Sequence, residues 1–129
     1  MAPNELQVKN PLRVVIVEDS ELICTQLRQE IESRGGIRVI GTASSESTAV
    51  DLILGCFPDV VLLDVNLQPG SGIKVLRKVR KAGHTCRIFM LTNEVTPAYR
   101  AICGALGISG YFDKSFEMER CLSSLYALL

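Results

Sequence analysis

Acidic, cationic and hydroxyl side chains stand at the ends of short apolar runs in this sequence. Glu18 and Asp19 follow LRVVIV, and Asp64 follows VVLL. Thr92 ends RIFMLT, and Lys114 follows GYFD. Any one of these residues fits ordinary turn or helix-cap chemistry, but such chemistry gives no reason for the same types to mark four separate run ends. We therefore treat them as one set.

If this set converges in space, its chemistry is that of a cation and a phosphoryl group. Three carboxylates held together repel one another, so the cluster takes up a proton or a cation. Mg²⁺ binds a few carboxylate oxygens and keeps several waters, which leaves positions open for phosphoryl oxygens. A lysine ammonium and a threonine hydroxyl both suit those oxygens. The residue types indicate magnesium-assisted phosphoryl chemistry.

Five repeats of one pattern position these residues. Each repeat is a short apolar run, typical of a β-strand, followed by a segment with helical spacing. The predicted strands are 12–17, 38–42, 60–63, 87–91 and 108–112. The first predicted helix is capped by Ser20 and stopped by Gly35 and Gly36, two more span about 45–56 and 71–82, a fourth starts at Pro97, and the last follows Ser115.

The alternation of strands and helices predicts the fold class. Short connections between them require right-handed crossovers and a parallel sheet, and nearly continuous apolar strands are expected where helices cover both faces. Five units are too few for a closed barrel, so the sheet is open. In an open parallel sheet the ligand binds beyond the carboxyl ends of the strands, where the whole polar set falls. The sequence predicts one α/β domain with its site at that edge.

The other single-residue signals have structural interpretations. Each of the five scattered cysteines is expected to be a small buried apolar residue, because their spacing favours neither disulfides nor zinc. His84 is expected to be an exposed turn residue. Helical spacing places Phe57 and Leu129 inward. The outward residues of the third helix are Lys74, Arg77, Lys78 and Lys81, a solvated basic face.

Length and composition set the broad class. The chain has 129 residues, the size of one domain, and 47% of them are hydrophobic. The 14 Lys and Arg residues balance 14 Asp and Glu residues, so no net field attracts nucleic acid or an anionic membrane. No apolar run reaches the roughly 18 residues of a membrane span, and the start lacks a signal peptide. We predict a cytoplasmic domain over 12–129 behind a flexible leader over 1–11, with no nucleic-acid or membrane contact.

Four motifs resemble the receiver domains of two-component response regulators. VVIVEDSEL resembles the first strand and acidic pair of that family, and VVLLDVNL its third strand with the phosphoacceptor aspartate. FMLT resembles the fourth strand with its Ser or Thr, and GYFDK the fifth strand with a switch aromatic three residues before lysine. The resemblance runs from Leu12 to the end of the chain. It implies a flavodoxin-like three-layer α/β sandwich, with a five-stranded parallel sheet of order 2-1-3-4-5 and five helices.

The resemblance also implies a role for each residue of the set and adds two residues. Asp64 is the implied phosphoacceptor, and Mg is the implied cofactor. The implied metal ligands are Glu18, Asp19, Asp64 and the backbone carbonyl of Asn66, while Thr92 and Lys114 bind phosphoryl oxygens and Tyr111 is the switch rotamer. Movement of the threonine toward the phosphoryl group vacates space into which the tyrosine turns.

Three positions depart from the family pattern. Ser115 replaces the proline that usually follows the lysine. The proline usual four residues after the phosphoacceptor is replaced by Gln68, and Pro69 follows it. Asn93 is bulkier than the Ala or Gly usual after the threonine, which narrows access to an acyl phosphate. None of these changes removes a chemical group that the reaction needs.

The function implied by the resemblance is a phosphorylation switch rather than an enzyme. Its phosphodonor is a sensor histidine kinase or a histidine phosphotransfer protein. Because the last helix reaches Leu129, we expect output by contact with a downstream protein or a second copy of the chain. The expected surface comprises the fourth helix, fifth strand and fifth helix, with apolar contacts from Ala98, Ala101, Ile102, Ala105, Met118 and Leu122.

Two alternatives stay open at this point. One is a receiver-like interaction module that works without phosphorylation, for which Asn93 and Ser115 leave room. The other is a flavodoxin-like protein that binds a cofactor at the same sheet edge. The second is disfavoured because Glu18 and Asp19 occupy the turn where a cofactor phosphate needs glycine and hydroxyl groups.

Overall fold

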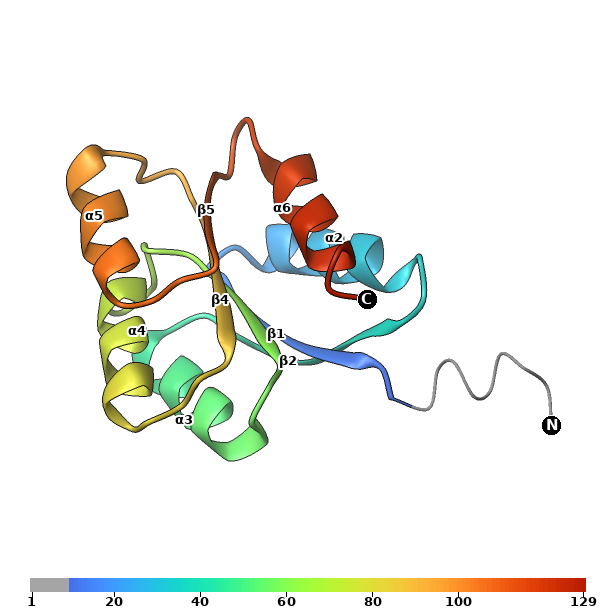
Figure 1. The fold of residues 1–129 in the computed structure, drawn as a ribbon, viewed down its shortest axis with the longest axis horizontal. Helices are drawn as coiled ribbons and strands as arrows, with labels where there is room; N and C mark the ends of the chain where they lie inside the picture. Colours follow the sequence, from blue (N-terminus) through green and yellow to red (C-terminus); the bar gives the residue numbers. More distant parts are fainter. Residues whose placement is uncertain (1–9) are drawn as a thin grey trace, which may run out of the picture.

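A computed structural model describes residues 10–129 of the chain, and its central layer is a sheet of five parallel strands (Figure 1). The strand order is β2-β1-β3-β4-β5, as predicted. Of the predicted leader over 1–11, residues 1–9 lie outside the described part. The strands are β1 (Leu12–Val17), β2 (Ile37–Ala43), β3 (Val60–Leu63), β4 (Arg87–Thr92) and β5 (Gly110–Asp113).

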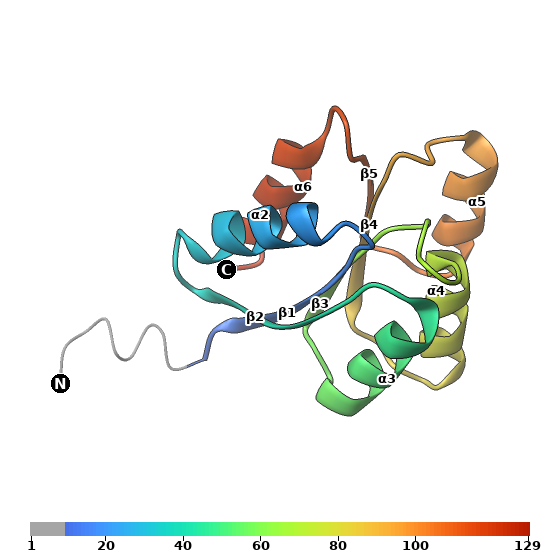
Figure 2. The same ribbon diagram turned by 180° about the vertical axis from the view of Figure 1, so that it is seen from behind.

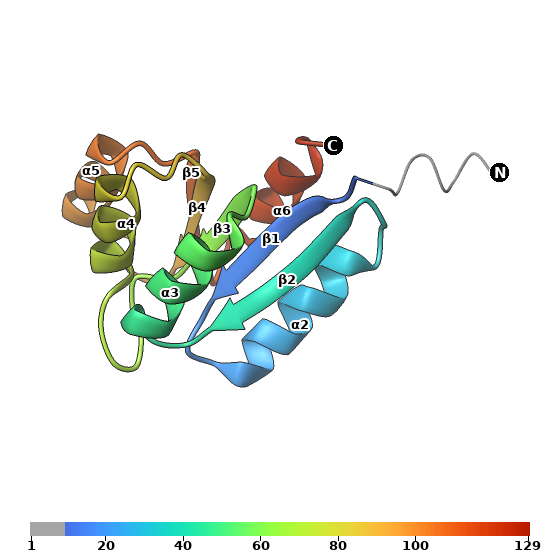
Figure 3. The same cartoon turned by 90° about the horizontal axis from the view of Figure 1, so that it is seen from below.

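Helices cover both faces of the sheet and complete a three-layer sandwich. One face is packed by α3, α4 and α5, and the other by α2 and α6 (Figure 2). Seen from below, β1 and β2 run side by side toward the same end, as parallel pairing requires (Figure 3). The helices are α2 (Glu21–Glu32), α3 (Glu46–Cys56), α4 (Gly72–Lys81), α5 (Pro97–Ala105) and α6 (Met118–Tyr126).

Side-chain caps explain where four of the five helices begin. Ser20, Ser45, Ser71 and Thr96 each accept a hydrogen bond from a backbone N–H in the first turn of α2, α3, α4 and α5. Pro97 occupies the first turn of α5, where its missing N–H costs nothing. These starts agree with the sequence prediction and fix the direction in which each strand end enters its helix.

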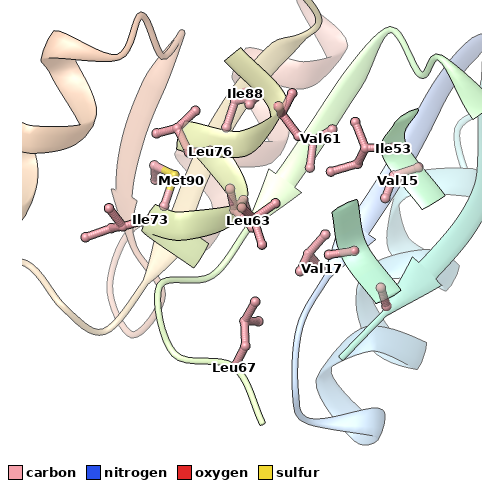
Figure 4. Packing of buried hydrophobic residues seen from close by; sticks show 14 of the residues in the cluster. Val15, Val17, Ile53, Val61, Leu63, Leu67, Ile73, Leu76, Ile88 and Met90 are labelled. Atoms are coloured by element: carbon pink, nitrogen blue, oxygen red, sulfur yellow. The ribbon is translucent and has the colours of Figure 1, made fainter. Parts of the chain in front are cut away.

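Two apolar clusters, one on each face, hold the layers together. Alternate residues of β1 contribute side chains to the two clusters. Val15 and Val17 face α3 and α4, whereas Val14 and Ile16 face α2 and α6. Figure 4 shows Val61, Leu63 and Met90 of the sheet packed against Ile53, Ile73 and Leu76 of the helices. All four residues of β3 are buried, so the polar groups just beyond them lie in an environment with little water.

The structure corrects two inward predictions. Phe57 ends α3 in a left-handed conformation with φ of 50°, which turns its side chain out of the helical path and leaves it 66% exposed. Leu129 lies beyond the end of α6, where helical spacing no longer applies, and it is 65% exposed. The strand predicted over 108–112 begins two residues later, at Gly110.

His84 is not the exposed turn residue that the sequence predicts. Its ring stacks on Phe57 with the two centroids 5.0 Å apart, and both ring nitrogens are buried without a hydrogen-bond partner. The cysteine prediction holds for three of five residues. Cys86, Cys103 and Cys121 are buried, whereas Cys24 and Cys56 are only partly buried. In the part of the chain that the structure describes, no helix is long and apolar enough to cross a membrane.

Candidate functional site

Four strands deliver polar side chains to the carboxyl edge of the sheet. Glu18 follows β1, Asp64 follows β3, Thr92 ends β4, and Lys114 follows β5. Only four polar or charged residues are buried between 10 and 129, and three of them belong to this set: Glu18 at 5% exposure, Asp64 at 3% and Thr92 at 0%. Burial of polar groups is costly unless they are paired, so their concentration at one edge marks a functional site.

Lys114 joins the two buried carboxylates. Its Nζ lies 2.6 Å from Oε1 of Glu18 and 2.5 Å from Oδ2 of Asp64. Burial by itself lowers the pKa of Lys114, but hydrogen bonds and charge attraction from both carboxylates outweigh it and raise the pKa above its usual value. The lysine is therefore a fixed positive charge in contact with Asp64.

Three carboxylates form a compact acidic group next to this lysine. Glu18, Asp19 and Asp64 each offer an oxygen, and these oxygens lie within 4.8 Å of one another. Burial first, and then the hydrogen bond with Asp19, raise the pKa of Glu18. Asp19 is exposed, so the group opens to solvent on one side. Hard carboxylate oxygens at this spacing, with an open side for water, fit a Mg²⁺ ion.

Asn66 lies beside the acidic group, two residues after Asp64. Its backbone N–H donates to Oδ1 of Asp64 over 3.2 Å, and its side-chain amide donates to Oε1 of Glu94 over 3.0 Å. Both carboxylate oxygens of Asp64 thus have a fixed donor, Asn66 on one and Lys114 on the other. The hydrogen bond from the Asn66 side-chain amide to Glu94 also joins the loop after β3 to the loop after β4.

The segment after Asp64 is fixed by contacts that the sequence analysis missed. The N–H of Gly72 donates to the carbonyl of Val65 over 2.7 Å, and a Cβ at position 72 would lie 1.9 Å from the backbone oxygen of Asp64. Only glycine permits so close an approach of α4. No local sequence pattern marks this glycine as essential, because the close contact is with the backbone of Asp64 at the end of β3.

Glu46 of α3 holds the same segment from the side and was also missed. Its Oε1 accepts from the backbone N–H of Ser71 over 3.0 Å, and its Oε2 accepts from Nζ of Lys78 over 2.8 Å. The hydrogen bond from Lys78 is the main reason that the pKa of Glu46 is lowered. Lys78 is exposed as predicted, yet its ion pair with Glu46 joins the last turn of α4 to the residue that holds the start of that helix.

Thr92 and Tyr111 are connected through Glu94. The Oγ1 of Thr92 accepts from the backbone N–H of Glu94 over 3.2 Å, and the hydroxyl of Tyr111 donates to the backbone carbonyl of Glu94. Burial raises the pKa of Tyr111 to about 12, so the hydroxyl stays protonated and acts as a donor. Tyr111 lies outside the acidic group and is linked to Thr92 through the backbone of this one residue.

Two of the three departures from the receiver pattern meet at the rim of the site. The hydroxyl of Ser115 and Oδ1 of Asn93 are 2.8 Å apart, and the N–H of Ser115 donates to Oδ1 of Asp113 over 2.8 Å. Within residues 10–129 the third departure, Gln68 followed by Pro69, forms a cis peptide bond. The serine and asparagine therefore join the loops that follow β4 and β5.

The fold and the site together define a doubly wound α/β domain with an acidic, lysine-bridged group at its carboxyl edge. Comparison with known proteins gives the family. The family model described as the response regulator receiver domain matches residues 14–126. This chain belongs to that family and is a receiver domain of two-component response regulators.

Individual relatives agree with this assignment. The chain is 33% identical over 118 residues to the nitrate/nitrite response regulator protein NarP of Escherichia coli, covering 91% of this chain and 54% of that protein. It thus spans about half the length of the curated relatives it matches. A LuxR-family two-component response regulator from Aurantimonas superposes with a TM-score of 0.84 at 27% identity, covering 92% of this chain and 84% of that one.

A third match is a complex in the solved structures. The chain is similar to one chain of the Borrelia burgdorferi CheX-CheY-BeF3-Mg²⁺ complex, with a TM-score of 0.76 at 25% identity. The match covers 89% of this chain and 90% of the other. The flavodoxin-like cofactor-binding alternative has no support from these relatives, and the acidic turn at Glu18 and Asp19 is inconsistent with it.

Proposed function

We propose that Asp64 accepts a phosphoryl group and that this receiver domain is a phosphorylation switch. The observation that carries the proposal is the placement of Asp64. It is buried, it lies within the acidic group, and Nζ of Lys114 lies 2.5 Å from its Oδ2. A carboxylate fixed in this way is already oriented at the sheet edge before a phosphoryl group arrives.

The proposed transfer step replaces a P–N bond with a P–O bond. A carboxylate oxygen of Asp64 attacks the phosphorus of a phosphohistidine, the P–N bond breaks, and its electron pair returns to the imidazole nitrogen. The product is an acyl phosphate on Asp64. Lys114, already bound to the attacking carboxylate, offsets the negative charge that gathers on the phosphoryl oxygens. Thr92 offers its hydroxyl proton to one of those oxygens, because its hydrogen bond with Glu94 is one that Oγ1 accepts and leaves the O–H free to donate.

The residues that would hold Mg²⁺ are Glu18, Asp19 and Asp64, and the backbone carbonyl of Asn66 is proposed as a further ligand. Their carboxylate oxygens fit the ion in type and spacing. When bound, Mg²⁺ supplies positive charge that helps to neutralise the phosphoryl group. The similar Borrelia complex is one with BeF3 and Mg²⁺, which supports the same ion here.

The proposed phosphodonor is a sensor histidine kinase or a histidine phosphotransfer protein. Two large apolar side chains near the site support a protein donor. Leu22, in the first turn of α2, is 68% exposed, and Phe116, two residues after Lys114, is 88% exposed. Apolar groups of this size flanking a charged site are suited to contact with another protein.

The proposed output surface consists of α5, β5 and α6, which would contact a downstream protein or a second copy of the chain. Tyr111 in β5 links it to the site through Glu94. One residue of the predicted surface is corrected: Leu122 is 7% exposed and belongs to the core, so it offers no contact. Met118 is partly buried, and the freely accessible apolar residues are Ala98, Ala101, Ile102 and Ala105.

The direct test of the acceptor is phosphorylation by acetyl phosphate in the presence of Mg²⁺. The wild-type protein should gain the mass of one phosphoryl group, and Asp64→Asn should abolish the gain. Asp51→Asn is the matched control, because Asp51 is an exposed aspartate on α3 away from the edge. A mass gain that persists in Asp64→Asn, or that needs no divalent ion, would contradict the proposed acceptor or metal site.

A second test separates the chemistry from the switch. Thr92→Ala and Lys114→Ala should retain some phosphorylation of Asp64, because neither residue supplies the nucleophile. Amide exchange on α5, β5 and α6 should change with beryllofluoride in the wild type, and much less in Thr92→Ala. If that surface is unchanged in the wild type, the chain is a phosphorylation-independent interaction module instead.

A further inference from the structure

Tyr111 is held from three sides. Its hydroxyl donates to the carbonyl of Glu94, and its ring packs against the apolar cluster under α3, α4 and α5. The outer side of the ring is covered by Arg100 of α5, whose guanidinium carbon lies 4.8 Å from the ring centroid. The tyrosine is thus turned toward the protein and capped by a cation.

Arg100 is itself tied to two other elements. Its Nε donates to the carbonyl of Val95 over 3.4 Å, and its Nη2 lies 4.0 Å from Oε1 of Glu117 at the start of α6. Glu117 in turn accepts from the N–H of Asp113 over 3.0 Å and from Arg120 over 2.7 Å. The position of Arg100 over the ring is therefore set jointly by α5, the loop before it and the end of β5.

We propose that Arg100 is a positioning residue that keeps Tyr111 in its inward position, with Glu117 orienting Arg100. This inference rests on the proposed role of Tyr111 as the switch rotamer. A guanidinium over the face of an aromatic ring is attracted to it, and the ring cannot turn outward without displacing the guanidinium. Arg100 thereby stabilises one of the two positions of the switch and links that position to α6.

The attraction of an exposed cation–π pair corresponds to a change of about two- to fivefold in the ratio of the two tyrosine positions. Removing Arg100 should raise the outward fraction of Tyr111 by that factor. Removing the charge of Glu117 should act in the same direction but more weakly, because the N–H of Asp113 and Arg120, not Arg100, are its closest partners.

The test is NMR of the complete, unphosphorylated chain labelled with ¹³C at the tyrosine ε positions. The chain has only three tyrosines, so each signal is assigned with one Tyr→Phe variant. A soluble nitroxide reports how far each ring is exposed to solvent. In Arg100→Ala the nitroxide effect on Tyr111 should rise about two- to fivefold, and by more than the effect on Tyr126 rises when Arg34, which covers that ring in the same way, is truncated to alanine. Glu117→Gln, which leaves Arg100 in place, should give a smaller rise, and a rise at Tyr111 no larger than that at Tyr126 would contradict the positioning role.

Arg34 provides a matched control in the same molecule. Its guanidinium carbon lies 4.3 Å from the ring centroid of Tyr126, so Arg34→Ala removes an equivalent pair remote from β5. That variant should change the signal of Tyr126 and leave Tyr111 unchanged. Arg100→Lys keeps a cation near the ring and should fall between wild type and Arg100→Ala, which also guards against loss of folding in the alanine variant.

The outcomes separate this inference from the proposed function. An unchanged nitroxide effect at Tyr111 in folded Arg100→Ala overturns the positioning role, whatever the phosphorylation result. Acetyl phosphate is applied to the same variants, and Arg100→Ala should still gain one phosphoryl group at Asp64. If Tyr111 responds as expected but the wild type is never phosphorylated, the proposed function fails while the contact between Arg100 and Tyr111 stands.

Discussion

The two edges of the sheet use charged side chains in opposite ways. At the carboxyl edge charged groups bind one another, as Lys114 does with Glu18 and Asp64. At the amino edge they bind the backbone. Arg13 donates to the carbonyls of Phe57 and Cys56 over 2.9 and 2.8 Å, which are the last carbonyls of α3.

Arg80 repeats this arrangement at the same amino edge. It donates to the carbonyls of Leu106, Gly107 and His84 over 3.1, 3.0 and 2.9 Å. Leu106 and Gly107 follow the end of α5. In a parallel α/β sandwich, helix C-termini with partial negative charge meet at this edge, so cations placed here are satisfied by structure alone.

The difference between the edges supports placing the proposed phosphoryl chemistry at the carboxyl edge. At the amino edge Arg13 and Arg80 are bonded to fixed carbonyls and have little capacity left for a ligand. At the carboxyl edge the helix N-termini favour anions, and the carboxylates there keep lone pairs that no protein donor uses. Substitutions at the amino edge should therefore cost stability, and those at the carboxyl edge should cost binding and phosphorylation.

The largest expected effect combines both costs. In Gly72→Ala the new Cβ would lie 1.9 Å from the backbone oxygen of Asp64, so α4 or the end of β3 must move. We expect a loss of about 3 kcal/mol in the free energy of unfolding, from overpacking, and no phosphorylation by acetyl phosphate. Urea unfolding and mass spectrometry measure the two effects.

Gly55→Ala is the matched control for this variant. Gly55 lies in α3, and a Cβ there meets no atom within 4 Å. It should be neutral or stabilising by up to about 1 kcal/mol, because alanine is the better helix former. A Gly72→Ala protein with wild-type phosphorylation would show that α4 does not fix the position of Asp64.

Arg80→Ala should lower stability through the amino edge alone, without affecting phosphorylation. Three hydrogen bonds from one charged group to backbone carbonyls are lost, so we expect about 2 kcal/mol of destabilisation. Phosphorylation of the folded protein should be unchanged. Arg87→Ala serves as control, because Arg87 is exposed and its side chain has no hydrogen bond or ion pair within residues 10–129; its effect should stay within about 0.5 kcal/mol. Reduced phosphorylation of folded Arg80→Ala would show that the amino edge also affects the reaction.

The smallest effect on stability is expected for Asp19→Ala at the carboxyl edge. Asp19 is exposed, so the free energy of unfolding should change little. Mg²⁺ affinity should fall about tenfold, because one charged oxygen ligand is lost. Metal titration by calorimetry checks this, with Glu21→Ala as control for a nearby exposed acid. Equal affinities in Asp19→Ala and wild type would mean that the acidic pair only compensates the dipole of α2.

The sequence predicted most of the fold because local signals and periodicity determined it. The bounds of β1 and β3 were predicted to the residue, and Ser20 caps α2 as expected. The inward predictions for Phe57 and Leu129 were wrong, because periodicity does not say where a helix stops. The prediction of an exposed His84 was wrong because the ring stacks on Phe57, which comes from the end of another helix, and such a tertiary contact leaves no local pattern.

The sequence predicted the position of those site residues that come directly after a strand. The structure brings together Glu18, Asp64 and Lys114 as expected, with Asp19 beside them. Glu46 and Glu94 were missed because their partners, Ser71 and Tyr111, lie 25 and 17 residues away in the chain. No local pattern reports such pairings, which only the packing of α3 on α4 and of β5 beside β4 creates.

The contact of Lys114 with both buried carboxylates has a consequence for charge counting. Glu18, Asp19 and Asp64 as carboxylates carry three negative charges, and the ammonium of Lys114 cancels one of them. With all three carboxyl groups ionised, the group holds a formal charge of minus two, which one divalent cation neutralises and one monovalent cation does not. Lys114 therefore sets the charge of the group to match one divalent ion, because without the lysine the same ion would leave a net charge of minus one.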